Sequence, residues 1–251
     1  MSEIAASEAF VRAYHARWPG VTGAAYARGR DPGGRSSYDL LAAAVRGRVR
    51  VLDLGCGASP LAGAIGIDLS IEELRLAGPR VVQARMETLP FADATFDACA
   101  SHLAFSILRD PEPAAREIAR VLVPGGVFAI VTGGAPAPDD ETFDLVLRLA
   151  RASASAPTPR LGDRRTRSRE GLDAILAPRF APCAWTSHTI DLGGAAEDVW
   201  ITLSTLYELS PLDDDQRARL RDDFLTHAGR GRVPCAMRIA VATAARTAAV
   251  G

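Results

Sequence analysis

Lysine and asparagine are both missing from the 251-residue chain, so all 29 of its basic residues are arginines. Both amino acids have AT-rich codons, and a GC-rich genome explains their absence together with the abundance of alanine and arginine. The 30 acidic residues balance the arginines to a formal net charge of −1. This balance argues against nucleic acid or another polyanion as the main partner.

Cysteine is scarce as well, and Cys56, Cys99, Cys183 and Cys235 lie far apart without a C-x-x-C pair. This spacing predicts neither a metal site nor a disulfide framework. No apolar run approaches the roughly 20 residues of a membrane span, and none follows a basic patch at the N-terminus. We therefore expect a soluble, cytoplasmic protein that binds no membrane. With 48% apolar residues, the chain can build one sizeable domain.

The first 47 residues are predicted to be mainly helical. Residues 3–18 carry apolar side chains at helical spacing, and a second helix is expected at 37–45. Residues 19–37 are interrupted by glycine and proline and show no regular period, so we expect no regular structure there. The apolar stripe of the first helix comprises Ile4, Phe10, Val11, Tyr14 and Trp18.

Short β-rich runs then alternate with helical runs. The helix at 110–126 is expected to begin at Pro111 or Pro113 and to end at the run Pro124-Gly125-Gly126. Alternation of this kind is typical of a doubly wound α/β fold with a mostly parallel sheet. Further helices are expected at 139–177, interrupted by a mobile loop at 152–169. The predicted strands are 48–54, 64–68, 80–84, 96–101, 126–132, 183–192 and 234–245.

Two glycines follow the first predicted strand, in the run VLDLGCGASP at 51–60. In an open parallel sheet, ligands bind beyond the carboxyl ends of the strands, where the winding direction reverses. Glycines there let the backbone approach a ligand and adopt positive φ. A dinucleotide loop would have a third glycine where this chain has Pro60, and the Asp53 carboxylate would repel a diphosphate. The loop therefore indicates a ligand that carries an ammonium or sulfonium group.

A second acid, Asp68, ends the second predicted strand in the run GIDLS. Nucleotide-binding folds place an acid there to accept hydrogen bonds from ribose hydroxyls. Together with ARMETLPFADATFD at 84–97 and RVLVPGG at 120–126, these features resemble class I S-adenosylmethionine (SAM) methyltransferases. The closest resemblance is to the small-molecule group that includes ubiquinone- and menaquinone-pathway enzymes and natural-product tailoring enzymes. It is close over residues 49–132 and looser beyond.

The resemblance implies a seven-stranded Rossmann-like sheet with an N-terminal helical lid and a small inserted cap region. The lid would be residues 1–47, and the SAM-binding domain would be residues 48–251. Within that domain, residues 137–180 and 193–230 would contribute elements on the substrate side. The N-terminal segment would also cover the cofactor, with Tyr38 or the serines beside it near the SAM carboxylate.

The resemblance also implies how the glycine loop and its neighbours contact SAM. Asp53 and the loop Gly55-Cys56-Gly57 would contact the amino-acid end of the cofactor. Asp68 would accept hydrogen bonds from the ribose hydroxyls. Ser101, at the end of the fourth strand, would lie beside the methionine moiety.

The adenine side shows a departure from the family. Leu69 and Met86 would enclose the ring, but Arg85 stands where the family often has the aspartate that binds the adenine amino group. Glu87 or a backbone carbonyl would then take that role, or the adenine contacts would be largely apolar. A second departure is that only 13 positions separate Gly55 from Asp68. The helix after the glycine loop would therefore be reduced to a turn or two near residues 59–64.

Two histidines are candidate general bases. His102 follows Ser101 on the loop above the sheet, and its ordinary pKa near 6.5 suits proton removal at neutral pH. It could equally pack the pocket floor or orient a cofactor carboxylate. His15 is the second candidate if the N-terminal helix is a lid, and otherwise it is a structural residue.

Five arginines crowd residues 160–169 around a single aspartate. This segment is expected to be a solvated loop before a helix with Ser168 as its N-cap. Alternatively, Arg164, Arg165 or Arg167 binds a carboxylate or phosphate of the substrate.

The leading interpretation is an enzyme that transfers the SAM methyl group to an O, N or C atom of a small, partly apolar metabolite. It would act as a monomer or homodimer in a bacterial secondary-metabolism tailoring step. An alternative keeps SAM as a fixed positive charge for cyclisation or decarboxylation. A nicotinamide oxidoreductase is disfavoured by Pro60 and Asp53, and a non-catalytic SAM-binding subunit is disfavoured by the intact loop and acid.

Overall fold

The computed structural model describes residues 2–137, 140–153, 158 and 160–248. Its centre is one seven-stranded sheet in the order β3-β2-β1-β4-β5-β7-β6. All neighbouring pairs from β3 to β5 are parallel, and β7 runs antiparallel to both β5 and β6. The mostly parallel, doubly wound sheet predicted from the sequence is confirmed. The strands are β1 Val51–Leu54, β2 Ile65–Asp68, β3 Val81–Gln83, β4 Phe96–His102, β5 Leu122–Pro136, β6 Ala184–Asp191 and β7 Ala236–Ala245.

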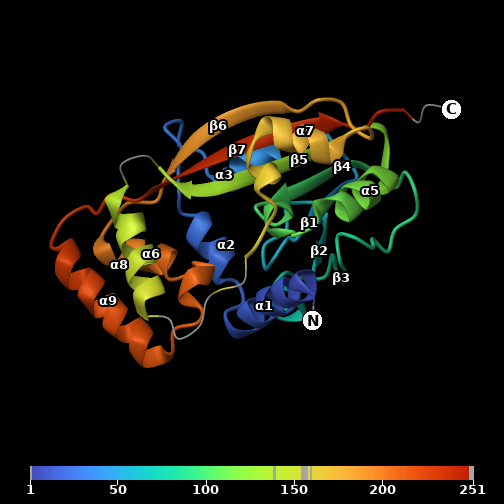
Figure 1. Ribbon diagram of the computed structural model, residues 1–251. Coiled ribbons are helices and arrows are strands. Elements are labelled where there is room, and N and C mark those ends of the chain that lie inside the picture. Colours follow the sequence, from blue (N-terminus) through green and yellow to red (C-terminus); the bar gives the residue numbers. More distant parts are fainter. Residues whose placement is uncertain (1, 138–139, 154–157, 159, 249–251) are drawn as a thin grey trace.

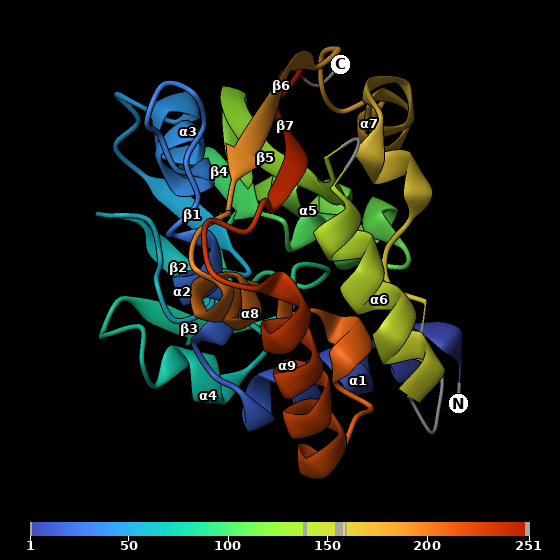
Figure 2. The same ribbon diagram turned by 90° about the vertical axis from the view of Figure 1, so that its left-hand side faces the viewer.

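Helices cover both faces of the sheet (Figures 1 and 2). In Figure 1, α6, α8 and α9 form a group set apart from α5 and α7. The helices are α1 Glu3–Arg17, α2 Val21–Tyr26, α3 Ser37–Ala44, α4 Ile71–Leu74, α5 Pro111–Val121, α6 Glu141–Ser153, α7 Arg169–Leu176, α8 Ala196–Leu203 and α9 Asp214–Ala228, with short 3-10 turns η1 Phe105–Ile107, η2 Arg164–Arg167 and η3 Tyr207–Leu209.

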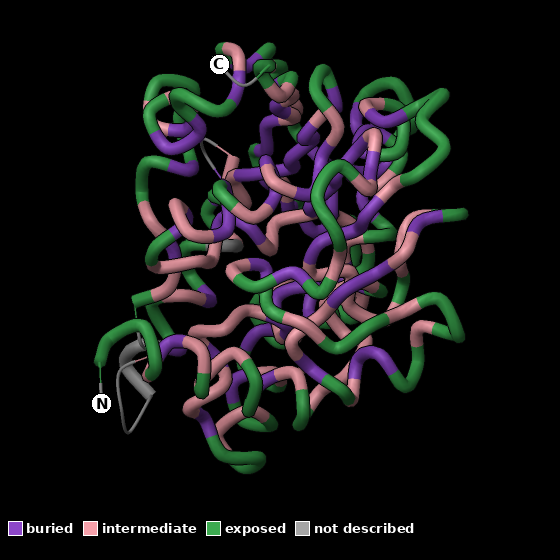
Figure 3. Tube along the Cα trace, turned by 90° about the vertical axis from the view of Figure 1, so that its right-hand side faces the viewer, coloured by how far each residue is buried: buried purple, intermediate pink, exposed green. Residues whose placement is uncertain are grey.

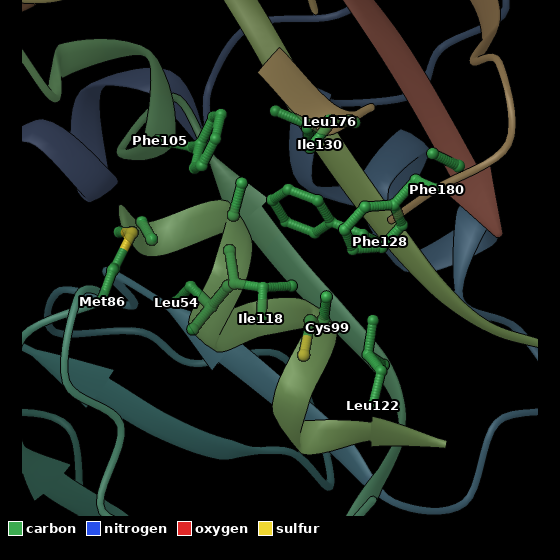
Figure 4. Close-up of a cluster of buried hydrophobic side chains, with 14 of the residues drawn as sticks. Leu54, Met86, Cys99, Phe105, Ile118, Leu122, Phe128, Ile130, Leu176 and Phe180 are labelled. Atoms are coloured by element: carbon green, nitrogen blue, oxygen red, sulfur yellow. The ribbon is translucent and has the colours of Figure 1, made fainter. Parts of the chain in front are cut away.

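The period-2 alternation of the central strands divides the apolar core into two clusters. On β5, Phe128 and Ile130 join the cluster under α5 and α7, whereas Ala129 and Val131 join the one under α3, α6, α8 and α9. Successive side chains of a strand point to opposite faces, so one strand serves both clusters. Figure 4 shows the first cluster, where Phe128 lies between Phe105 and Phe180, and Figure 3 shows buried segments running through the middle of the molecule.

Three local expectations differ from the structure. Residues 19–37 were expected to be irregular, yet they contain α2, which follows Gly20 in the left-handed conformation (φ 78°). The helical turn expected near residues 59–64 does not form among the described residues, because the Asp53 carboxylate accepts the Leu61 N–H at 2.8 Å and holds the segment as tight turns. β5 extends beyond the expected 126–132 at both ends, since α5 stops at Val121.

The remaining helix boundaries follow their capping residues. α5 begins with Pro111, and α7 begins after Ser168, whose hydroxyl accepts the Gly171 N–H at 3.2 Å. The loop expected at 152–169 falls partly on residues outside the described ranges, and its described end forms η2. Within those ranges, no helix is both long enough and apolar enough to cross a bilayer.

The winding direction reverses between β1 and β4, which are neighbours in the sheet although two strands separate them in sequence. In open α/β sheets the ligand crevice forms at this place, outside the carboxyl ends of the strands. The fold therefore directs the glycine loop after β1 and the loop after β4 toward one site.

Candidate active site

A cavity of about 680 Å³ opens at the carboxyl ends of β1, β2, β4 and β5. The strand ends contribute Gly55, Asp68, His102 and Gly133 to its wall, and α1 and α2 cover it from the other side. This volume lies within the range of about 300–1,000 Å³ that is typical of small-ligand sites. Among the described residues, no group of three or more His, Cys, Asp or Glu side chains could hold a metal ion.

The glycine loop forms the floor of the cavity below β1. Gly55 and Gly57 have φ of 67° and 55°, a region that residues with a Cβ rarely adopt. A Cβ on Gly55 would also lie 2.4 Å from the Ala104 Cβ and 2.9 Å from the Met86 Cε. Cys56 holds the loop against β2, since its N–H donates to the Ile67 carbonyl at 2.9 Å. The loop therefore depends on glycine for both its backbone conformation and its close packing.

Asp53 lies at the back of the cavity and is only 4% exposed. Its carboxylate accepts the Leu61 N–H at 2.8 Å. Burial raises the pKa of Asp53 to about 7, and the nearby Asp68 adds to the rise. Asp53 is thus a buried acid that becomes charged near neutral pH and would gain from a cationic ligand.

Asp68 joins the ends of β1 and β2. One carboxylate oxygen accepts the Gly57 N–H at 2.9 Å, and the other accepts the Ser70 N–H at 2.8 Å. Burial raises the pKa of Asp68, and these two hydrogen bonds oppose that rise. Because a carboxylate oxygen has two lone pairs, each oxygen keeps one acceptor position for a hydroxyl donor in the cavity.

The residues expected around the adenine lie together on the cavity wall: Leu69, Arg85, Met86 and Glu87. The charge of the Arg85 guanidinium is balanced, because it forms ion pairs with Glu8 of α1 at 2.5 Å and with Glu87 at 3.7 Å. This part of the wall therefore combines an apolar surface with a neutralised arginine. The ion pair to Glu8 also connects α1 to the loop after β3.

Ser101 was expected beside the methionine moiety, but the structure buries it completely, and it does not line the cavity. Its hydroxyl donates to the Leu54 carbonyl at 3.0 Å and accepts the Phe105 N–H at 3.1 Å. It points away from the cavity because its neighbour His102 points toward it. Ser101 therefore stabilises the connection from β4 to η1.

His102 lines the cavity and stacks on Tyr38 from α3, with ring centroids 3.9 Å apart. Its Nε2 lies 2.8 Å from the Ser37 hydroxyl. Burial lowers the pKa of His102 to about 3, so the ring is neutral throughout the physiological range. The expectation of a pKa near 6.5 is therefore wrong, because the site removes this imidazole from water.

His15 lies in a hydrogen-bonded chain at the other side of the cavity. Its Nδ1 is 2.8 Å from a Glu73 carboxylate oxygen, and its Nε2 is 3.0 Å from the Tyr207 hydroxyl. All three residues line the cavity, and Glu73 is 3% exposed. Sequence reasoning missed Glu73 and Tyr207. The acidic first turn of α4 after β2 was a usable signal for Glu73, whereas no local pattern marks Tyr207.

The arginine-rich segment is divided by the structure. Arg165 forms ion pairs with Asp163 at 2.6 Å and Glu112 at 2.7 Å. Arg164 is exposed and does not line the cavity, whereas Arg167 does. Of the three arginines proposed to face a substrate, the structure brings only Arg167 to the site.

Comparison with known proteins agrees with this architecture. Residues 52–130 match the family model of a methyltransferase domain. The malonyl-[acyl-carrier protein] O-methyltransferase of Pseudescherichia vulneris is 39% identical over 113 residues, which cover 39% of this chain and 45% of that protein. The ubiquinone/menaquinone biosynthesis C-methyltransferase UbiE of Syntrophotalea carbinolica is 30% identical over 138 residues, covering 47% and 56%.

The chain spans about half the length of these curated relatives. Over a longer range, it superimposes on the crystal structure of the YcgJ protein from Bacillus subtilis with a TM-score of 0.54 and 22% identity, covering 84% of this chain and 98% of that one. This similarity shows a shared fold. Strand order, glycine loop and domain match thus agree, and residues 52–130 belong to the methyltransferase domain family.

Proposed function

We propose that the protein binds SAM and transfers its methyl group to an O, N or C atom of a small, partly apolar metabolite, in a secondary-metabolism tailoring step. The observation that carries this proposal is the pair of carboxylates, the buried Asp53 and the half-buried Asp68, on either side of the glycine loop at the reversal point of the sheet. When bound, SAM supplies a methyl group activated by a sulfonium charge, and S-adenosylhomocysteine is left.

The residues present fit this cofactor. Asp53 offers a buried negative charge to the ammonium or sulfonium, and Asp68 offers an acceptor position on each oxygen to the ribose hydroxyls. Leu69 and Met86 offer apolar surface to the adenine. Tyr38 and Cys56 also line the cavity, and Tyr38 stacks on His102 at the β4 end, where the methionine end would lie.

The half of the cavity toward β4 and β5 fits an acceptor with apolar character. It is lined by Tyr26, Leu103, Pro136 and Leu147, as well as by His102. Apolar and aromatic walls with few polar groups are typical of sites for small organic ligands. In-line positioning of the acceptor supplies much of the rate, because the methyl group is already activated.

Two candidate functions share this site. Use of SAM as a fixed charge for cyclisation or decarboxylation needs the same cofactor contacts but releases no S-adenosylhomocysteine. The methyltransferase domain match favours transfer. A nicotinamide oxidoreductase would need the diphosphate to approach Asp53, which is buried and acidic.

Incubation with methyl-labelled SAM and a metabolite extract tests the proposal. We expect labelled product and stoichiometric S-adenosylhomocysteine from the wild type. Asp68→Ala should weaken SAM binding by about 1–3 kcal/mol, the usual cost of a lost charged acceptor. Asp222→Ala is the control, since that carboxylate lies exposed on α9. Conversion of a metabolite without labelled product or S-adenosylhomocysteine would favour the use of SAM as a fixed charge. Equal affinities for SAM in the two variants would remove Asp68 from the ribose site.

The raised pKa of Asp53 predicts a pH-dependent affinity for SAM. A raised carboxyl pKa means that the free protein must lose a proton to bind a cation, so affinity rises with pH up to about 7. Calorimetry should give a dissociation constant about tenfold higher at pH 6 than at pH 8, with proton release on binding. Asp53→Asn should bind weakly and without this dependence. A pH-independent wild type would contradict the assignment of Asp53 to the cationic end.

His102 is proposed to position the acceptor as a neutral ring. Since the pKa of His102 is lowered to about 3, its ring is uncharged above about pH 4. Its titration should therefore cause no rise or fall in the pH–rate profile between about pH 5 and 9. At saturating SAM, His102→Gln should lower turnover by less than the roughly 10²–10⁴-fold of a general base. The prediction is contradicted if the wild-type rate rises with pH near about 6.5 and the His102→Gln rate does not, because His102 would then act as the general base.

Residues 1–47 are proposed to act as a lid, with His15 as the second candidate base. α1 is bonded to both halves of the site through Glu8 with Arg85, Glu3 with Arg109, and His15 with Glu73. If His15 donates its Nδ1–H to Glu73, its Nε2 can accept the Tyr207 hydroxyl proton, which places a proton path at the cavity wall.

Removal of residues 1–18 tests the lid. The sheet should still fold, since β1 begins at Val51, and turnover should fall by about 10²-fold because water enters and the acceptor is misplaced. Circular dichroism and steady-state kinetics at saturating SAM measure the two effects. A folded, fully active truncated protein would exclude a lid.

A further inference from the structure

Among the residues that the structure describes, three arginines line the cavity, and two of them are neutralised by ion pairs. Arg85 is paired with Glu8 and Glu87. Arg109 is paired with Glu3 at 2.7 Å and donates to the Gly162 carbonyl at 3.3 Å. The side chain of Arg167 forms no hydrogen bond or ion pair with any residue that the structure describes. It is therefore the cavity arginine whose charge is available to a ligand.

The side chain of Arg167 is exposed, but the backbone that carries it is held in place. Thr166 is completely buried, and its carbonyl accepts the Thr132 hydroxyl at 2.7 Å. The Thr166 hydroxyl donates to the Asp163 carbonyl at 2.7 Å, and the Gly162 N–H donates to the Ile107 carbonyl at 3.0 Å. η2 is thus bonded both to β5 and to the connection after β4.

These bonds place Arg167 at the acceptor half of the cavity. Thr132 directly precedes Gly133, where β5 enters the cavity wall, whereas the cofactor half is formed by the ends of β1 and β2. Arg167 therefore lies near the end of the sheet where the acceptor is proposed to bind. An arginine fork matches carboxylate and phosphate groups, with which it forms two parallel hydrogen bonds.

Among the described residues, Arg167 is an unpaired positive charge in a cavity whose other charged lining residues are mainly acidic. Seven carboxylates from the described part of the chain line the wall, and the Arg167 side chain pairs with none of them. They are Glu8, Asp53, Asp68, Glu73, Glu87, Asp110 and Glu208. Without a counter-charge at Arg167, the remaining lining would repel an anionic acceptor.

We propose that Arg167 binds a carboxylate or phosphate group of the methyl acceptor, which makes the substrate an anionic, partly apolar molecule. This inference rests on the proposed function, because it assigns the substrate class of that site. Arg165 is excluded from the role by its ion pairs with Asp163 and Glu112. Arg164 lies in the same turn, is exposed and lies outside the cavity lining, so it provides a matched control.

Calorimetry on protein saturated with S-adenosylhomocysteine tests the proposal with three probes of similar shape: phenylacetate, phenyl phosphate and the neutral phenylacetamide. The wild type should bind at least one anion about tenfold or more tighter than the amide, as expected for a charged hydrogen bond. The tighter anion identifies the ligand group as a carboxylate or a phosphate. Arg167→Gln should lose this preference, and Arg164→Gln should keep it.

Four results of the anion titrations would overturn the proposal. These are equal binding of anion and amide, no anion binding to the wild type at about 10 mM, an unchanged preference in Arg167→Gln, and a preference lost equally in Arg164→Gln. A loss of S-adenosylhomocysteine affinity confined to Arg167→Gln would also overturn it, by assigning the arginine to the cofactor. Failure of the wild type to bind S-adenosylhomocysteine at all contradicts the proposed function instead, and the anion preference is then measured without it.

Discussion

The carboxylate of Asp68 connects the two strand ends on which the site is built. By accepting the N–H groups of Gly57 and Ser70, it holds the glycine loop after β1 against the turn after β2. The close packing of this loop against the segments after β3 and β4 depends on Gly55, because a Cβ there would lie 2.9 Å from the Met86 Cε and 2.4 Å from the Ala104 Cβ. A single half-buried acid thus shapes the floor of the cavity and supplies acceptor positions to the hydroxyls that enter it.

Burial shifts the pKa values of Asp53 and His102 in opposite directions. Removal from water raises the pKa of Asp53 to about 7 and lowers that of His102 to about 3, because in both cases the charged form is disfavoured. A cationic ligand beside Asp53 would stabilise its carboxylate and so lower its raised pKa. It would not favour protonation of His102. The same low-polarity site therefore favours a sulfonium cofactor and keeps the nearby imidazole neutral.

Much of the fold follows from local sequence patterns. Hydrophobic alternation specifies the strands. Pro111 marks the start of α5, and Ser168 marks the start of α7. The glycine loop, together with Asp68, locates the site. These features depend on neighbouring residues, so one sequence is enough to find them.

What could not be predicted depends on contacts between distant segments. The stack of Tyr38 on His102, the bond between His15 and Tyr207, and the pairing of Arg165 with Glu112 all join residues more than fifty positions apart. Ser101 was misplaced for a related reason: the alternation of β4 does not by itself tell which of two adjacent residues faces the cavity. In the arginine-rich segment, likewise, only the folded chain shows that Arg165 is paired with acids and that Arg167, not Arg164, lines the cavity.

A crystal structure of the complex with S-adenosylhomocysteine tests the central claim most directly. The account predicts the ribose hydroxyls within hydrogen-bonding distance, about 2.5–3.0 Å, of the Asp68 carboxylate, with the amino group directed toward Asp53 and the adenine against Leu69 and Met86. A nucleoside bound elsewhere in the cavity, or a ribose that does not contact Asp68, would contradict it.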